Sequence, residues 1–190
     1  MSAQSWGAEL IVVDNGSSDR TAEIVAELAT DRPEVRLLHE AEPGKGAAVR
    51  TGMRAGRGEH LFMCDADLAM PIDQVVRLLP PRCEACDIAI ASREGPGARR
   101  HGEPHHRHLM GRAFNLFVQA VAMPGIRDTQ CGFKSFRRDV AREVFAHQTM
   151  TGFGFDVEVL FIARRRGYRI REVPIEIGRA SCRERECHRV

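Results

Sequence analysis

The sequence lacks any long apolar run and carries almost no net charge. No stretch of apolar residues approaches the roughly 20 that a membrane-spanning helix requires. The formal net charge is +2, which is too small to indicate binding to nucleic acid. With 190 residues, of which 43% are hydrophobic and 28% charged, the composition predicts one soluble globular domain that is large enough to bury a core.

The sequence also lacks the cysteine pattern of a disulfide-stabilised or zinc-binding domain. Its six cysteines have no regular spacing, which favours a reducing compartment over a disulfide framework. Cys83 and Cys86 form a CxxC pair, but neither a second such pair nor a pair of histidines completes a zinc site. The sequence therefore gives little support to a metal role for this pair.

Short apolar segments alternate with segments of helical periodicity. Four runs rich in apolar and β-branched residues predict strands at residues 9–13, 35–38, 60–64 and 87–91. This alternation is typical of an α/β fold with a mostly parallel sheet flanked by helices. After a polar segment rich in Gly, Pro, Arg and His, the later pattern predicts helices at 109–123, 139–146 and 155–166 and a strand at 168–173.

Carboxylates follow two of the predicted strands. Asp14 ends the first strand, and Asp65 and Asp67 follow the third. Ligands of open α/β sheets bind beyond the carboxyl ends of the strands, so we expect these side chains along one rim. Neighbouring carboxylates repel each other and are costly to desolvate unless a cation lies between them. Two hard oxygen donors favour Mg²⁺ or Mn²⁺, with phosphates and water as the other ligands; the alternative is a solvated loop or a helix cap.

Two polar turns add candidate ligand contacts. In "DNGSSDRT", Asp14 can accept hydrogen bonds from a base or ribose, with Ser17 and backbone amides nearby, although a helix cap explains the same pattern. In "GKG", the glycines allow a backbone to approach a ligand closely and Lys45 supplies a cation at a helix start. The spacing matches neither a Walker loop nor a GxGxxG fingerprint.

Together these segments resemble the family 2 glycosyltransferases of GT-A fold, a Rossmann-like α/β fold, over residues 9–174. "VVDNGSSDRT" is similar to the family's nucleotide-binding segment and "DAD" to its metal motif. Further segments are similar to the branch of dolichyl-phosphate glucosyltransferase and dolichyl-phosphate mannose synthase; these are "GKGAAVRTGM", "DADLAMP", "SRE", "RDTQCGFKSFRR", "FGFDVEVL" and "GYRIREVPI".

The resemblance implies an inverting transfer of a sugar from a nucleoside-diphosphate donor to a polyprenyl phosphate, at the cytoplasmic face of a membrane. It implies that Mg²⁺ or Mn²⁺ on Asp65 and Asp67 stabilises the departing diphosphate. Val12, Asp14 and the Asp65–Ala66 stretch would hold the nucleoside. UDP-glucose is favoured over a mannose donor, because Ala69 stands where some mannose synthases have a third metal-side Gln.

The acceptor phosphate is already anionic, so it needs cations to hold it in line and no strong general base. The candidate cations are Arg93, Arg107 and Arg112, with Lys45 and Arg127 behind them. The resemblance places Asp128, Gln130 and Lys134 at the sugar and acceptor site, although Asp128 can instead cap a turn. Asp156 and Glu158 fall where many relatives carry a catalytic carboxylate, a role that this acceptor does not demand.

Two departures from the family pattern concern the ends of the chain. The family normally begins with a strand ending in a Pro-Ala-Tyr-Asn-Glu type segment, which has no counterpart here. Residues 176–190 lack any helical or strand period. We therefore expect a catalytic domain at 1–175 without its first strand, and a non-native or disordered tail. Alternatives are an inactive nucleotide-binding fragment that folds poorly, or a sugar-activating nucleotidyltransferase; the oligomeric state is not predicted.

Overall fold

The computed structural model describes residues 7–66, 70, 72–84, 86–92 and 123–175. These residues form two compact units, each assembled from two separate segments of the chain. The first unit comprises Met1–Leu61 and Arg137–Val159, and the second comprises Phe62–Phe136 and Leu160–Val190. Several predictions fall outside the described residues; these concern Asp67, Ala69, Arg93, Arg107, Arg112, the helix at 109–122 and the tail at 176–190.

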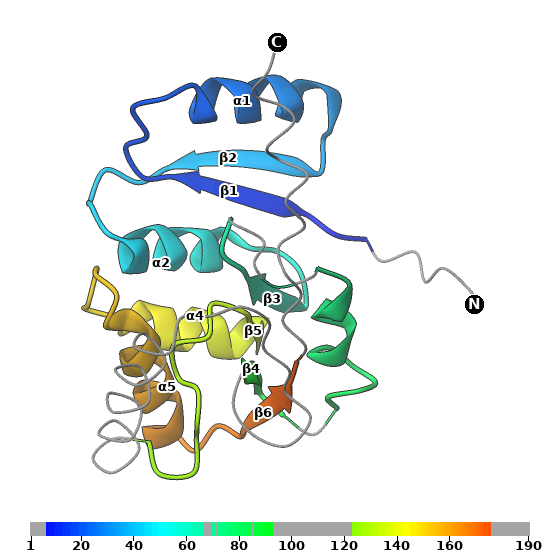
Figure 1. Ribbon diagram of the computed structural model, residues 1–190, viewed down its shortest axis with the longest axis vertical. Helices are drawn as coiled ribbons and strands as arrows, with labels where there is room; N and C mark the ends of the chain where they lie inside the picture. Colours follow the sequence, from blue (N-terminus) through cyan, green and yellow to red (C-terminus); the bar gives the residue numbers. More distant parts are fainter. Residues whose placement is uncertain (1–6, 67–69, 71, 85, 93–122, 176–190) are drawn as a thin grey trace, which may run out of the picture. The chain divides into compact units, whose positions relative to one another are not determined.

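The first unit is built on two parallel strands with a helix on each side (Figure 1). Strand β1 (Leu10–Asp14) pairs with β2 (Val35–His39), and the register runs from Leu10 opposite Val35 to Asp14 opposite His39. Helix α1 (Thr21–Asp31) packs mainly on β2, and α2 (Lys45–Ala55) packs on β1 and on α4 (Arg138–Ala146). The strand at 9–13 and the strand at 35–38 are thus confirmed.

Helix α1 is only partly covered. None of its residues is buried, and Ile24 and Leu28 are 54% and 44% exposed. The partly buried residues of this helix have small or β-branched side chains, namely Ala22, Val25 and Ala29. A two-stranded sheet offers too narrow a surface to cover a whole apolar helix face, which accounts for the exposure.

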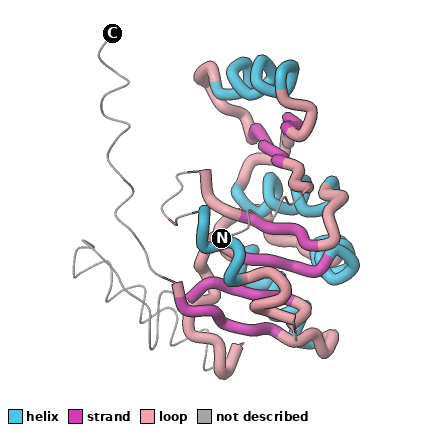
Figure 2. The backbone as a smooth tube through the Cα atoms, turned by 90° about the vertical axis from the view of Figure 1, so that its right-hand side faces the viewer, coloured by secondary structure: helices cyan, strands magenta, loops and turns pink. Residues whose placement is uncertain are grey.

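The second unit contains most of a four-stranded sheet of order β3-β5-β4-β6 (Figure 2). The strands are β3 (His60–Met63), β4 (Ile88–Ser92), β5 (Lys134–Arg137) and β6 (Ile170–Pro174). Strand β4 pairs in parallel with β6 and antiparallel with β5. All five residues of β4 are buried, as expected for an inner strand with both faces covered. The parallel prediction therefore holds for β4–β6, while β5 runs in the opposite direction.

Two other elements complete the described secondary structure. Helix α5 (Phe155–Arg165) matches its predicted position. Residues Ile72–Arg77 form a short 3₁₀ helix, η1. Turns follow η1, in which the backbone N–H groups of Leu78, Arg82 and Cys83 donate to carbonyl oxygens three or four residues earlier.

The core of the second unit is rich in sulfur and aromatic side chains. Phe133 meets Phe62 edge-on, with ring centroids 4.4 Å apart. Cys131 lies in the same core, with its Sγ 3.5 Å from Sδ of Met70. The buried members of this cluster are Met70, Leu78, Cys83, Ala89, Ala91, Cys131, Phe133, Val173 and Ile175. The segment that contains Cys131 and Phe133 is therefore anchored by its side chains.

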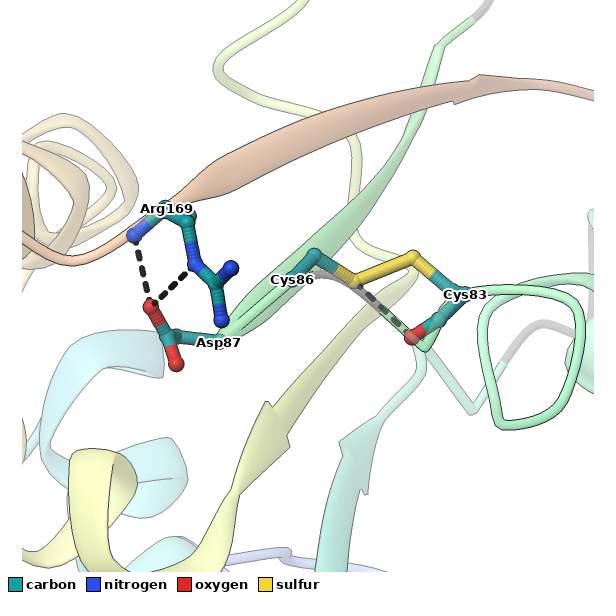
Figure 3. Close-up of a disulfide and its surroundings, with 4 residues drawn as sticks. All are labelled: Cys83, Cys86, Asp87 and Arg169. Atoms are coloured by element: carbon teal, nitrogen blue, oxygen red, sulfur yellow. Dashed lines mark hydrogen bonds and ion pairs between the residues drawn. A yellow bond between two sulfur atoms is a disulfide. The ribbon is translucent and has the colours of Figure 1, made fainter.

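Cys83 and Cys86 form a disulfide (Figure 3), a bond that the cysteine pattern did not predict. The bond closes a turn of the chain in which the two Cα atoms are 6.1 Å apart, within the usual reach of a disulfide. The next residue, Asp87, accepts a hydrogen bond of 2.8 Å from the backbone N–H of Arg169. Cysteine spacing alone did not reveal this local turn, because CxxC also occurs in metal and redox sites.

An ion pair at the start of α4 predicts a small pH dependence of stability. The Arg137 guanidinium donates two hydrogen bonds of 2.7 Å to the Asp139 carboxylate, and this contact is the main cause that lowers the pKa of Asp139 from 3.8 to about 2. A carboxyl group with a lowered pKa stabilises the fold above its unfolded pKa, and that stabilisation is lost as the pH falls through the folded value.

We expect Asp139→Asn to lower the free energy of unfolding by about 0.5 kcal/mol at pH 7, because both partners are largely exposed to solvent. Near pH 2 most of the difference should be gone. Urea denaturation at the two pH values measures this difference in the free energy of unfolding. The control is the double variant of Asp139→Asn with Arg137→Ala: once Arg137 is absent, Asp139→Asn should cause no further loss of stability. An equal loss at both pH values would contradict the assignment.

Candidate functional site

Asp14 closes β1 beside the end of β2. Its carboxylate accepts a hydrogen bond of 3.2 Å from the backbone N–H of Ser17, and its Oδ2 lies 3.4 Å from Nδ1 of His39. Hydrogen bonds from Ser17, chiefly from its side chain, and the contact with His39 lower the pKa of Asp14. The structure thus brings Asp14 and Ser17 together as predicted, and these contacts favour the ionised carboxylate. Val12 lies two residues earlier on the same face of β1.

Asn15 fixes the loop that leads from β2 to α2, a role that the sequence reading missed. Its amide donates to the carbonyl oxygens of Glu40 and Glu42 at 2.9 and 2.8 Å, and its Oδ1 accepts a hydrogen bond of 2.8 Å from the N–H of Gly44. An aspartate at this position would accept hydrogen bonds but donate none when ionised. The amide of Asn15 allows one side chain to bind two carbonyl acceptors and one N–H donor.

The glycines at the start of α2 admit the protein's own backbone. The carbonyl oxygen of Thr151 accepts hydrogen bonds from the N–H groups of Gly46 and Ala47 at 2.6 and 3.2 Å. A Cβ atom at Gly44 would lie 2.3 Å from that oxygen, and one at Gly46 would lie 2.6 Å from the carbonyl oxygen of Met150. The space beside these glycines, which was expected to admit a ligand, is therefore filled by the backbone of residues 148–152.

The segment at 148–152 is held in place by two polar side chains. The Glu158 carboxylate accepts hydrogen bonds from the backbone N–H groups of Thr149 and Met150 and from the Thr149 hydroxyl, at 2.6 to 3.1 Å. Gln148 donates from Nε2 to the carbonyl oxygens of Gly46 and Met150 at 2.9 and 2.7 Å. These contacts give Glu158 a structural function, without any need for a catalytic one.

Lys45 extends from the start of α2 over an exposed aromatic ring. Its Nζ lies 6.0 Å from the ring centroid of Phe153, at the outer limit of a cation–π contact, and Phe153 is 75% exposed. The pair forms an accessible cationic and aromatic surface in the first unit. A role for Lys45 in binding phosphate stays a prediction.

Asp65 lies in the second unit, directly after β3, with its carboxylate seated on Gly132. A Cβ atom at Gly132 would lie 2.2, 2.6 and 2.8 Å from Oδ2, Cγ and Oδ1 of Asp65. Carboxylate oxygens are the ligands that Mg²⁺ and Mn²⁺ prefer, so the donor chemistry of Asp65 fits the predicted metal. Among the described residues there is no group of three or more His, Cys, Asp or Glu side chains that could hold a metal ion.

Asp128 is completely buried at the head of the "DTQCGFK" segment. The backbone N–H groups of Arg127 and Asp128 both donate to Oε1 of Glu172, at 2.8 and 3.0 Å. At the other end of the segment the buried Lys134 donates from Nζ to the carbonyl oxygen of Cys131 at 2.6 Å. Glu172 was missed from sequence, because a lone carboxylate on a strand carries no signal for a contact 44 residues away.

The candidate residues are thus divided between the two units. Val12, Asp14, Ser17 and Lys45 belong to the first unit, and Asp65, Ala66 and Asp128 belong to the second. A common rim for Asp14 and Asp65 stays a prediction. Across residues 7–66, 70, 72–84, 86–92 and 123–175, no helix combines the length and apolar character that crossing a membrane requires.

Comparison with solved structures identifies the fold. The chain superposes on glucosyl-3-phosphoglycerate synthase from Mycobacterium tuberculosis, solved with Mn²⁺, uridine diphosphate and glucosyl-3-phosphoglycerate, with a TM-score of 0.64. The sequence identity is 21%, and the match covers 89% of this chain and 59% of that chain. This likeness confirms the predicted GT-A fold.

Sequence comparison identifies the family. The chain is 40% identical over 177 residues to a dolichyl-phosphate beta-glucosyltransferase of Trichomonas vaginalis, covering 88% of this chain and 52% of the relative. It is 35% identical over 173 residues to the dolichyl-phosphate beta-glucosyltransferase of Homo sapiens, covering 82% and 51%. The chain spans about half the length of these curated relatives. Residues 5–145 match the family described as Glycosyl transferase family 2, and the chain therefore belongs to that family.

Proposed function

We propose that this protein transfers glucose from UDP-glucose to the phosphate of a polyprenol of the dolichol type, with inversion at the anomeric carbon. The observation that carries the proposal is the 40% identity to a dolichyl-phosphate beta-glucosyltransferase along 88% of the chain. The described side chains are suited to two of the functions that such a reaction needs, namely binding the nucleoside and binding the diphosphate.

The nucleoside would bind at the end of β1. The lowered pKa of Asp14 keeps its carboxylate an acceptor for N–H or O–H groups of a uridine. Val12 lies on the same face of the strand and offers an apolar contact. Ser17 and His39 keep the Asp14 carboxylate from rotating away, since they contact its two different oxygens.

The diphosphate would bind near Asp65, with Asp67 as the second carboxylate. A divalent cation held by these residues would supply positive charge for the leaving diphosphate. The solved relative with Mn²⁺ and uridine diphosphate supports Mn²⁺ or Mg²⁺ as that ion. The task of Asp65 itself is to present a fixed pair of oxygens, which its seat on Gly132 favours.

The acceptor is an anionic phosphate on a lipid, so the protein would work at a membrane surface, on its cytoplasmic face. Arg93, Arg107 and Arg112 are the proposed cations that hold the acceptor phosphate, with Lys45 as a further candidate. Asp128 and the buried segment that follows it would shape the sugar site, because Glu172 and Lys134 hold the two ends of that segment.

The test is UDP-glucose binding by calorimetry, with and without Mn²⁺, on this chain, Asp65→Asn and Asp67→Ala. We expect binding that depends on Mn²⁺ and is weakened by about tenfold or more in either variant. Asp73→Asn, which changes an exposed carboxylate of η1, is the matched control and should bind like the unchanged protein.

A transfer assay then separates the possible activities. Glucosyl transfer to dolichyl phosphate, in preference to mannosyl transfer from GDP-mannose, would support the proposal. Release of pyrophosphate from UTP and glucose 1-phosphate would instead indicate a nucleotidyltransferase. Absence of UDP-glucose binding in the unchanged chain would indicate an inactive fragment.

A further inference from the structure

We propose that Gly132 is a positioning residue for Asp65: the missing side chain at position 132 creates the seat in which the Asp65 carboxylate is held. The expected effect on ligand binding rests on the proposed function, whereas the contact between Gly132 and Asp65 does not. All three terminal atoms of Asp65 lie closer than 3.0 Å to the position that a Cβ atom of residue 132 would take. The carboxylate and a side chain at 132 therefore exclude each other.

The backbone of Gly132 is fixed from both sides, so it cannot retreat to make room. Before it, Cys131 is fully buried and its Sγ contacts Sδ of Met70 at 3.5 Å. After it, Phe133 is 1% exposed and accepts a hydrogen bond of 2.9 Å from the N–H of Ala91 on β4. Because well-packed cores resist displacement, the group that would yield is the Asp65 carboxylate.

A buried cation reinforces this rigidity. Lys134 is fully buried, and its Nζ donates to the carbonyl oxygen of Cys131, the residue before Gly132, at 2.6 Å. A hydrogen bond from a charged donor is stronger than one between neutral groups. This hydrogen bond joins the two ends of the turn at residues 131–134, and the Asp65 carboxylate lies against Gly132 within that turn.

Asp65 follows the end of β3 and is only partly buried. An aspartate has a single rotatable bond before its carboxylate carbon, and rotation about it moves both oxygens at once. A side chain at 132 would therefore turn the oxygens of Asp65 away from the place that Gly132 now gives them. The expected result is weak binding of a metal–diphosphate ligand by a protein that still folds.

The first measurement is the affinity for uridine diphosphate with Mn²⁺, by calorimetry. We expect Gly132→Ala to weaken this affinity by about tenfold or more. Val144→Ala is the control for stability, because Val144 on α4 is fully buried and lies outside the core cluster that contains Cys131 and Phe133; it should lower the Tm and leave the affinity unchanged. Affinity retained in Gly132→Ala, when the unchanged protein binds, overturns the positioning role alone. Absence of binding in the unchanged protein overturns the proposed function and this role with it.

The second measurement is a double-mutant cycle in Tm, which needs no ligand. Gly132→Ala should lower the Tm by about 3 °C in the unchanged background and by clearly less when Asp65 is also replaced by alanine. Equal losses in both backgrounds would show that Gly132 acts independently of Asp65 and would overturn the inference. If Gly132→Ala alone does not fold, folding of the double variant supports the contact, and failure of the double variant refutes it.

Discussion

Replacing Gly44 with alanine should destabilise the protein by about 3 kcal/mol, because the new side chain would both strain the backbone conformation and clash with a neighbouring segment. Gly44 has φ 133° and ψ 143°, a region that side chains other than glycine rarely adopt. In addition, the new Cβ atom would lie 2.3 Å from the carbonyl oxygen of Thr151 and 2.9 Å from its carbon. Both neighbours are backbone atoms, so the contact cannot be relieved by a change of side-chain rotamer.

Urea denaturation followed by circular dichroism measures this effect. Gly152→Ala is the matched control, since a Cβ atom at Gly152 meets no atom within 4 Å and its φ is not in the restricted positive range. That control should stay within about 0.5 kcal/mol of the unchanged protein. A Gly44→Ala variant as stable as Gly152→Ala would mean that the start of α2 does not pack on residues 148–152.

Truncation of Phe133 to alanine is expected to cost about 3–5 kcal/mol, the usual range for a fully buried phenylalanine. The ring is 1% exposed and meets Phe62 edge-on at 4.4 Å. Its removal would leave a cavity among residues that cannot easily collapse, because β4 on one side has no exposed residue. The loss would also loosen Gly132, the neighbouring residue that carries the Asp65 carboxylate.

Phe153→Ala makes the same chemical change at a ring that is 75% exposed, and it should cost no more than about 0.5 kcal/mol. The comparison uses the denaturant midpoint and slope, so that a change in compactness is distinguished from a change in stability. Similar losses for the two phenylalanines would be incompatible with a core built around Phe133.

Sequence reasoning succeeded where the determining contacts are local. The strands β1, β2 and β4 are short apolar runs, and a strand that pairs in parallel with a neighbour needs little more than that pattern. Asp14 and Ser17 are three residues apart, so the turn that joins them is specified by its own sequence. The family resemblance then supplied the GT-A fold, which periodicity alone would have left as an unspecified α/β arrangement.

Sequence reasoning failed where a residue serves a distant partner. The glycines at 44 and 46 were interpreted as a ligand approach, because a glycine shows only that something comes close and not what it is. Asn15 and Glu172 bind backbone groups that lie 25 or more residues away in the sequence. Gly132 likewise lies against Asp65, which is far from it in the sequence. The disulfide between Cys83 and Cys86 is a local exception, because the cysteine spacing does not specify the turn that brings the two residues together.

The discontinuous first unit has a consequence for synthesis on the ribosome. Its strands β1 and β2 and the helix α2 belong to Met1–Leu61, but the residues that complete it belong to Arg137–Val159. Gln148, which binds the carbonyl oxygen of Gly46, is made 102 residues later. At usual elongation rates this interval lasts about 5–20 s. During that time the nascent chain has no partner segment for the start of α2, so we expect chaperone binding to be concentrated on the first 61 residues until translation has passed residue 159.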